Sequence, residues 1–352
     1  MLDFIIVGLG LSGLAVTSRL EERNKSYRVY ENLSQKSSLV AGGIFNPVIL
    51  KRFTLAWNAD EQLKMAIPFY QQFEKKYNVS IVHFWDIYRR FYSAEEQNNW
   101  FDAADKPRLV RFLDTQLVKN INSHIDADFS YGRVSTTGNI DTEILLDAYR
   151  NDLKERALLE YEEFDYDLLK IEADHVSYKG EKAKNVIFCD GFGLKKNPYF
   201  NYLPLYGNKG EYITIFSEEL KLDKAVKSSV FIMPMGNDLY KVGATYNNTD
   251  KSPEPTEEAR KKLISEIDKV ITCKYEVIDQ IAGIRPSTAD RKPLVGRHPK
   301  LANIYCCNGF GSRGVLIAPS VSKELIEMIE DNKELSPEID LKRFTRKHFN
   351  AD

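Results

Sequence analysis

The sequence has few cysteines, no long apolar run and no excess of charge of either sign. The four cysteines show no metal-ligand spacing, and the adjacent Cys306 and Cys307 stand in an apolar run typical of a buried strand. No apolar stretch approaches the roughly 18 residues of a membrane span, and no basic leader precedes the first apolar run. We therefore expect a protein of the reducing cytoplasm that does not span a membrane.

The balance of charge and the few histidines disfavour a nucleic-acid-binding protein and a metalloprotein. The 49 lysine and arginine residues balance 51 acidic residues, for a formal net charge of −2, which disfavours a dedicated nucleic-acid-binding protein but leaves a local basic face open. Lys342-Arg343 and Arg346-Lys347 form a basic segment, which we expect to be a solvated helix end and not an RNA contact. The five histidines form no triad or ligand set, so no metal site is expected.

The first residues of the chain carry a nucleotide-binding pattern. A predicted strand at 4–7 is followed by Gly8-Leu9-Gly10-Leu11-Ser12-Gly13, a helix at 14–23 and a strand at 27–30. Gly8 permits a tight turn, Gly10 lets the backbone approach a pyrophosphate, and Gly13 lets the helix pack closely on the strand. Glu31 ends the second strand, where a carboxylate accepts hydrogen bonds from a ribose hydroxyl and repels the 2′-phosphate of NADP. The unit predicts a bound dinucleotide without distinguishing NAD from FAD.

Beyond this unit, hydrophobic periodicity predicts helices and strands that alternate along the chain. Helices are expected at 59–77, 141–156, 257–270 and 317–330. Strands are expected at 81–92, 109–112, 185–190, 211–216, 229–235, 239–246 and 303–307, with Gly236-Asn237-Asp238 as a hairpin turn. A chain of 352 residues with 43% hydrophobic residues favours two co-folded domains. Because no linker separates them, we expect their two sheets to interleave in sequence.

Further motifs follow one another in a specific order along the rest of the chain. They are Ala41-Gly42-Gly43-Ile44-Phe45-Asn46-Pro47, Val186-Ile187-Phe188-Cys189-Asp190-Gly191, Lys209-Gly210-Glu211-Tyr212, Val242-Gly243-Ala244-Thr245, Gly283-Ile284-Arg285-Pro286-Ser287-Thr288-Ala289-Asp290, Pro293-Leu294-Val295-Gly296 and Gly309-Phe310-Gly311-Ser312-Arg313-Gly314. From residue 4 to about residue 330 this series resembles the D-amino-acid-oxidase-like family of FAD-dependent oxidoreductases. Glycine oxidase, the sarcosine oxidases and the oxidoreductase domain of the bifunctional tRNA wobble-uridine-modifying enzyme look closest. The methyltransferase domain of that bifunctional enzyme has no counterpart here, so the complete enzyme is not expected.

The resemblance implies an α/β fold (α+β overall) with two interleaved domains. Residues 1–45, 134–203 and 284–352 would form a Rossmann-like FAD-binding domain, and residues 46–133 and 204–283 a substrate domain with a mixed, largely antiparallel sheet and helices. FAD is expected to bind non-covalently, because the cysteine that attaches flavin in sarcosine oxidases has no counterpart near Arg285. Cofactor contacts are expected at Gly8, Gly10, Leu11, Ser12, Gly13, Glu31, Ala41, Gly42, Gly43, Phe164, Cys189, Gly191, Gly309, Gly311, Ser312, Gly314 and Val315. The last of these open a helix whose positive end would stabilise the reduced flavin.

The resemblance also implies five residues on the substrate side. Arg285 would hold a substrate carboxylate with two hydrogen bonds, and Tyr246 and Phe231 would line the pocket. Lys241 matches a sarcosine oxidase lysine that promotes the reaction with oxygen. Arg313 stands one position after the second active-site arginine of glycine oxidase, so a contact with the substrate, a contact with the flavin and an orientation away from both stay open. The competing interpretations are a salt bridge for Arg285, a solvent-facing strand position for Lys241 and core packing for the two aromatic residues.

Together these features predict an enzyme that oxidises the C–N bond of an amino acid or an N-substituted glycine. Hydride transfer to flavin N5 would give an imine that hydrolyses, with O₂ or a quinone as electron acceptor. The alternatives are a tRNA-modifying FAD oxidoreductase that acts on carboxymethylaminomethyl-uridine and a non-catalytic FAD-binding protein. A nicotinamide-dependent dehydrogenase would leave the carboxyl-terminal glycine motif unexplained. Substrate, stereochemistry, acceptor and oligomeric state stay open.

Overall fold

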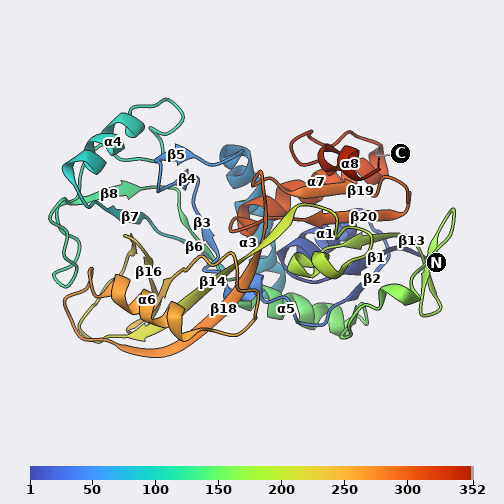
Figure 1. Ribbon diagram of the computed structural model, residues 1–352, viewed down its shortest axis with the longest axis horizontal. Helices are drawn as coiled ribbons and strands as arrows, with labels where there is room; N and C mark the ends of the chain where they lie inside the picture. Colours follow the sequence, from blue (N-terminus) through green and yellow to red (C-terminus); the bar gives the residue numbers. More distant parts are fainter. Residues whose placement is uncertain (350–352) are drawn as a thin grey trace.

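Residues 1–349 form two larger β-sheets with helices packed around them, as the computed structural model shows in Figure 1. The first sheet contains β10 (Leu159–Glu160), β2 (Tyr27–Tyr30), β1 (Leu2–Val7), β13 (Glu181–Phe188), β12 (Val176–Tyr178), β11 (Lys170–Ile171), β20 (Ile304–Asn308) and β19 (Leu294–Arg297). The second contains β18 (Glu276–Thr288), β14 (Leu205–Phe216), β17 (Leu239–Gly243), β16 (Phe231–Gly236), β15 (Ala225–Lys227), β7 (Ile87–Arg90) and β8 (Tyr131–Val134). The strands of the two sheets alternate along the chain, as the absence of a linker predicts.

Parallel pairing organises the centre of the first sheet. β1 lies between β2 and β13, and β10 and β20 extend the parallel set on either side. Phe4 and Ile6 point into one apolar core and Ile5 points into another. All three side chains are fully buried, because a sheet that is covered on both faces needs continuous apolar runs.

The turn from β1 into α1 (Leu11–Glu22) has the geometry that its glycines predict. Gly8 has a φ of +95°, a conformation that favours glycine. A Cβ at Gly13 would lie 2.1 Å from the carbonyl oxygen of Gly8, so only glycine lets the helix approach this closely. The helix begins at Leu11, earlier than the predicted residue 14, because Gly10 is its N-cap and the later part of the glycine motif is already helical.

Antiparallel pairing dominates the second sheet, where only β15 and β7 run parallel. The longest pairing joins β14 to β18 and sets Asn208 opposite Arg285. The predicted hairpin at Gly236-Asn237-Asp238 is confirmed between β16 and β17, with positive φ angles of 52° and 58° at Asn237 and Asp238. The chain therefore has the expected α/β (α+β overall) architecture, although β18 runs across the expected domain boundary at 283–284.

The remaining elements surround the two sheets. The helices are α2 (Ser37–Val40), α3 (Ala59–Tyr77), α4 (Ala94–Ala104), α5 (Thr142–Glu155), α6 (Glu257–Ile267), α7 (Gly314–Asp331), α8 (Lys342–Phe349) and the 3₁₀ turns Tyr166–Leu168 and Gly191–Lys196. The short strands are β3 (Ile44–Phe45), β9 (Gly138–Ile140) and β6 (Val82–Phe84) in one sheet, and β4 (Val48–Ile49) and β5 (Thr54–Leu55) in another. In Figure 1, α4 and α6 flank the second sheet on the left, and α1 and α7 lie with the first sheet on the right.

The predicted strand at 109–112 is wrong. Leu109 and Phe112 are buried, but they lie in successive turns that follow α4, a helix that the apolar pattern does not predict. Trp100 of α4 is fully buried and donates its indole N–H to the carbonyl of Asp114 at 2.8 Å, which holds this segment against the helix. Ser93 caps α4 by accepting from the backbone N–H of Glu96, so the Ser-x-x-Glu pattern at 93–96 was the available signal.

Smaller differences concern where elements begin and end. The predicted strand at 81–92 is divided into β6 and β7, and the strand predicted at 239–246 already ends at Gly243. The basic segment forms α8, in which Nε of Arg343 pairs with the Asp290 carboxylate at 2.9 Å. The side chains of Arg346 and Lys347 lie outside the described residues. Among the residues that the structure describes, no helix has both the length and the apolar character needed to cross a membrane.

Candidate active site

A long pocket lies where the two sheets meet. It begins at the carboxyl ends of β1, β2 and β13, passes the amino-terminal ends of α1 and α7, and reaches β14, β16 and β18 of the second sheet. Most of the predicted cofactor residues line it: Gly8, Gly10, Leu11, Ser12, Glu31, Ala41, Gly42, Gly43, Phe164, Cys189, Gly191, Gly311, Ser312, Gly314 and Val315. Gly13 and Gly309 are not part of the lining, and Gly309 adopts a φ of +80°. Ligand-binding crevices at the carboxyl ends of parallel strands are typical of such sheets.

Glu31 forms the acidic end of this pocket. Its buried carboxylate accepts hydrogen bonds from the backbone N–H groups of Leu9 and Leu33, the latter at 2.6 Å. These bonds hold the carboxylate beside the glycine turn, as the sequence motif predicts. The group therefore has a fixed orientation in which it can accept hydrogen bonds from the hydroxyls of a ribose.

The amino-terminal ends of two helices supply positive charge to the same pocket. The N-cap residues, Gly10 of α1 and Arg313 of α7, supply no side-chain cap, and neither helix has an acidic residue in its first turn. One N–H of α1, that of Leu11, donates to the Ser38 hydroxyl at 3.2 Å. The first N–H groups of a helix have no partner within the helix and carry the positive end of its dipole. α7 begins at Gly314 and not at the predicted residue 317, so its first turn itself lines the pocket. Both ends suit a ligand with negative charge.

The comparison with protein families agrees with this geometry. The family described as FAD dependent oxidoreductase matches residues 3–328 of the chain. The chain belongs to this family of FAD-dependent oxidoreductases. Its members are FAD-dependent flavoproteins, which makes this pocket the candidate site for FAD.

Individual relatives are glycine oxidases and tRNA-modifying enzymes. Glycine oxidase of Bacillus licheniformis is 31% identical over 133 residues, which cover 36% of this chain and 35% of that protein. The tRNA 5-methylaminomethyl-2-thiouridine biosynthesis bifunctional protein MnmC of Campylobacter jejuni is 24% identical over 363 aligned positions, covering 93% of this chain and 55% of that protein. The crystal structure of glycine oxidase from Geobacillus kaustophilus has a TM-score of 0.80 at 18% identity and covers 97% of both chains. In the two sequence alignments, the matched region covers only about a third of the Bacillus licheniformis protein and about half of the Campylobacter jejuni protein.

The residues that line the pocket fit FAD. Glu31 suits the ribose of its adenosine part, the amino-terminal end of α1 suits the pyrophosphate, and the amino-terminal end of α7 suits the negative charge that a flavin gains on reduction. Phe164 lines the pocket beside Glu162 and Glu163, and Cys189 lines it at the end of β13. All four cysteines are free, and three of them are buried.

Arg285 lies on β18 at the part of the pocket that belongs to the second sheet. Its Nη1 donates to the side-chain oxygen of Asn208 at 2.8 Å and to the carbonyl of Thr245 at 3.2 Å. A Cβ at Gly210 would lie 2.0 Å from Nη2, which explains why the motif places a glycine there. Among the described residues, no carboxylate forms an ion pair with Arg285, so its charge faces the pocket without a matching acid. The predicted salt-bridge alternative is therefore not supported.

Tyr246 and Phe231 both line the pocket, as predicted. The Tyr246 ring lies 4.6 Å from the guanidinium carbon of Arg285 and is 68% exposed, so it stands at the pocket mouth and is not a core residue. Phe231 is half-buried and pairs with Gly243 across β16 and β17. The two rings can shield a bound substrate from water while leaving an entrance beside Tyr246.

The other two predicted side chains lie near the Ala41–Pro47 motif. Nη2 of Arg313 donates to the carbonyl of Asn46 at 2.8 Å, and burial lowers the pKa of Arg313 to about 10. Lys241 is neither solvent-facing nor part of the pocket lining. Its Nζ lies 3.5 Å from the carbonyl of Ala41 and 5.1 Å from the centre of the Tyr212 ring, and burial lowers its pKa.

The sequence does not reveal three polar residues of this region: Asp190 and Lys227, which line the pocket, and Asn208, which contacts Arg285 from outside the lining. Asp190, at the end of β13, accepts from the amides of Asn197 and Asn308, and burial raises its pKa to about 6. Asn208 was missed because only the pairing of β14 with β18 brings it to Arg285. Lys227 lines the pocket on the short strand β15, and burial, together with nearby Arg89, lowers its pKa to about 8. Of these three residues, only Asp190 had a usable signal in the sequence, since it directly precedes Gly191 at the end of a predicted strand.

Replacement of Glu31 by glutamine tests the cofactor site. A charged acceptor contributes about 1.5–3 kcal/mol per hydrogen bond, so we expect the FAD dissociation constant of Glu31→Gln to rise by about 10- to 100-fold. Fluorescence titration of the apoprotein with FAD measures this change. Glu160→Gln is the matched control, since Glu160 ends the neighbouring strand β10 outside the pocket; equal affinities of the two variants would contradict the assignment.

Proposed function

We propose that this chain oxidises the C–N bond of a small amine that carries a carboxylate, either an amino acid or an N-substituted glycine. The observation that carries the proposal is the guanidinium of Arg285, which faces the pocket without an acidic partner and is oriented by Asn208 and Thr245. Such a fork is suited to a carboxylate because both of its N–H groups can donate to one anion. The relatives named as glycine oxidases support the same substrate class.

The chain's own residues would position the amine. FAD, when bound, supplies the acceptor for the hydride that leaves the carbon beside the nitrogen. Arg285 would hold the carboxylate so that this carbon has one orientation, and Tyr246 and Phe231 would exclude water around it. No histidine lines the pocket within the described residues, so we propose that the amine binds with its nitrogen unprotonated and needs no protein base. The imine that results is then hydrolysed by water, and O₂ or a quinone takes up the electrons.

A second candidate function is the oxidation of a modified uridine in tRNA. The relative from Campylobacter jejuni, whose name assigns it to tRNA 5-methylaminomethyl-2-thiouridine biosynthesis, aligns with 93% of this chain. A carboxymethylaminomethyl group is itself an N-substituted glycine, so Arg285 could hold its carboxylate in the same way. The 68% exposed ring of Tyr246 at the pocket mouth offers a surface on which a base can stack.

Arg285→Met tests the carboxylate clamp. Loss of a buried partner from a charge pair costs about 2–5 kcal/mol, so we expect kcat/KM for the best carboxylate-bearing amine to fall by about 30-fold or more. Steady-state kinetics measure the loss, and the flavin content should stay at the level of the unmodified protein. Arg291→Met is the control because Arg291 is exposed and lies outside the pocket. Unchanged kinetics for Arg285→Met would contradict the proposal.

We further propose that Lys227 favours substrates that carry a second anionic group. Its Nζ donates to the carbonyl of Ser229 at 2.8 Å and lies 5.0 Å from the ring centre of Phe231. No described carboxylate pairs with it, so a second substrate carboxylate can. With a pKa of about 8, Lys227 is cationic below that pH and neutral above it.

The pH dependence of this preference is measurable with iminodiacetate as the substrate. We expect kcat/KM of the unmodified protein to exceed that of Lys227→Met below pH 8, because the ammonium then attracts the second carboxylate. The ratio between the two proteins should fall toward one as the pH rises through about 8. Sarcosine, with one carboxylate, is the control and should give no such change. A ratio for iminodiacetate that does not depend on pH would count against the role of Lys227.

A further inference from the structure

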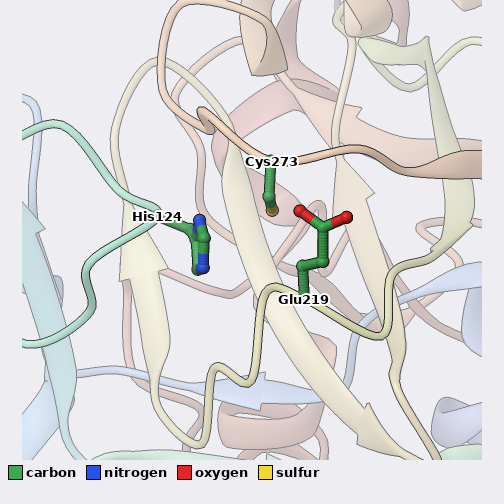
Figure 2. Close-up of side chains that lie close together, drawn as sticks. All are labelled: His124, Glu219 and Cys273. Atoms are coloured by element: carbon green, nitrogen blue, oxygen red, sulfur yellow. The ribbon is translucent and has the colours of Figure 1, made fainter.

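Three loops at the end of the second sheet bring together side chains that can hold a metal ion. They carry His124, which precedes β8, Glu219, which follows β14, and Cys273, which lies between α6 and β18. One ligand atom from each residue lies within 4.8 Å of the other two. Figure 2 shows the three side chains pointing toward one another. The sequence predicts no metal site because these residues come from segments far apart in the chain.

Hydrogen bonds between the loops hold this arrangement in place. The backbone N–H of Thr272 donates to the carbonyl of His124 at 2.9 Å, which ties the first loop to the third. The side-chain amide of Asn122 donates to the carbonyl of Leu220 at 2.6 Å, which ties the first loop to the second. The Ser217 hydroxyl donates to the carbonyl of Lys274 at 2.6 Å and closes the set. The ligand atoms are therefore brought together by hydrogen bonds to the backbone of these loops that do not need a metal.

The three ligand atoms have few other partners. Within the described residues, no hydrogen bond or ion pair involves the His124 ring or the Glu219 carboxylate, and the Sγ of Cys273 has only the Ser217 hydroxyl, at 3.6 Å. The other cysteines are buried in the first sheet or at its edge, whereas Cys273 is half-buried and accessible from the surface. The cluster thus presents one sulfur, one imidazole nitrogen and one carboxylate oxygen to a common point.

We propose that His124, Glu219 and Cys273 bind one Zn²⁺ ion, with water as the fourth ligand. Zn²⁺ binds sulfur, nitrogen and oxygen ligands in tetrahedral geometry, whereas Mg²⁺ and Ca²⁺ take oxygen ligands. A ligand set of one sulfur, one nitrogen and one oxygen therefore favours zinc. Metal–ligand bonds of about 2.0–2.3 Å require the three side chains to close slightly around the ion. Because none of the three lines the pocket, the ion would join the three loops and stabilise this end of the sheet without taking part in the oxidation.

Metal binding and its residue dependence test the proposal on tag-free holoenzyme that has been treated with a chelator. We expect calorimetric titration with ZnCl₂ to show one ion per chain, and a Zn²⁺-dependent rise in melting temperature. His124→Gln and Cys273→Ser should each weaken binding by about tenfold or more. Glu218→Gln is the control, since Glu218 is an exposed neighbour that does not belong to the cluster, and it should bind like the unmodified protein.

Substitution of Co²⁺ for Zn²⁺ gives a second, spectroscopic measurement of metal binding that does not depend on the melting temperature of the protein. A tetrahedral Co²⁺ site with a thiolate ligand absorbs in the red, where oxidised flavin does not, and this band should be lost in Cys273→Ser. Unchanged flavin content shows that each variant is folded and separates this test from the proposed oxidation. The proposal is overturned if the unmodified holoenzyme binds no Zn²⁺, or if His124→Gln and Cys273→Ser bind Zn²⁺ as tightly as Glu218→Gln does.

Discussion

Positive charge without a matching acid is the constraint around which the pocket between the two sheets is built. Arg285, Arg313 and Lys227 line it without an ion-pair partner among the described residues, and the amino-terminal ends of two helices add partial charges. Burial of unpaired cations is unfavourable, which is why the pKa values of Lys227 and Arg313 are lowered. Such a site suits anions, and we propose that the pyrophosphate and reduced flavin of FAD and the carboxylate of a substrate fill this role.

The fold holds these charges apart and in fixed orientations. The parallel strands of the first sheet end beside the glycine turn, where Gly13 lets α1 approach Gly8 closely enough to present its N–H groups. The pairing of β14 with β18 sets Asn208 against Arg285 and leaves room at Gly210 for the guanidinium. Because strands of both sheets alternate along the chain, cofactor and substrate residues come from segments that fold against each other, and neither half of the pocket is complete without the other.

The sequence predicted the parts of this site that depend on local geometry. The turn at Gly8 to Gly13 and Glu31 follow from spacing within one strand–turn–helix–strand unit, and the hairpin at 236–238 follows from its turn residues. Resemblance to the family, and not periodicity, pointed to Arg285 and Tyr246. The roles of Asn208 and Lys227 depend on long-range strand pairing that one sequence does not reveal, and the same holds for the meeting of His124, Glu219 and Cys273. The segment 109–112 was predicted wrongly because buried apolar residues in turns have the composition of a strand.

The most direct test of the account is the visible spectrum of the purified protein, recorded without oxygen while amines are added. Glycine, sarcosine, iminodiacetate, D-amino acids and L-proline would be added in turn, followed by tRNA that carries carboxymethylaminomethyl-uridine. The account predicts a bound flavin whose absorption band is bleached by at least one free amine that carries a carboxylate. A flavin reduced by the modified tRNA alone would replace the free-amine proposal with the tRNA-modifying one. A bound flavin that none of these substrates reduces would contradict the proposed oxidation.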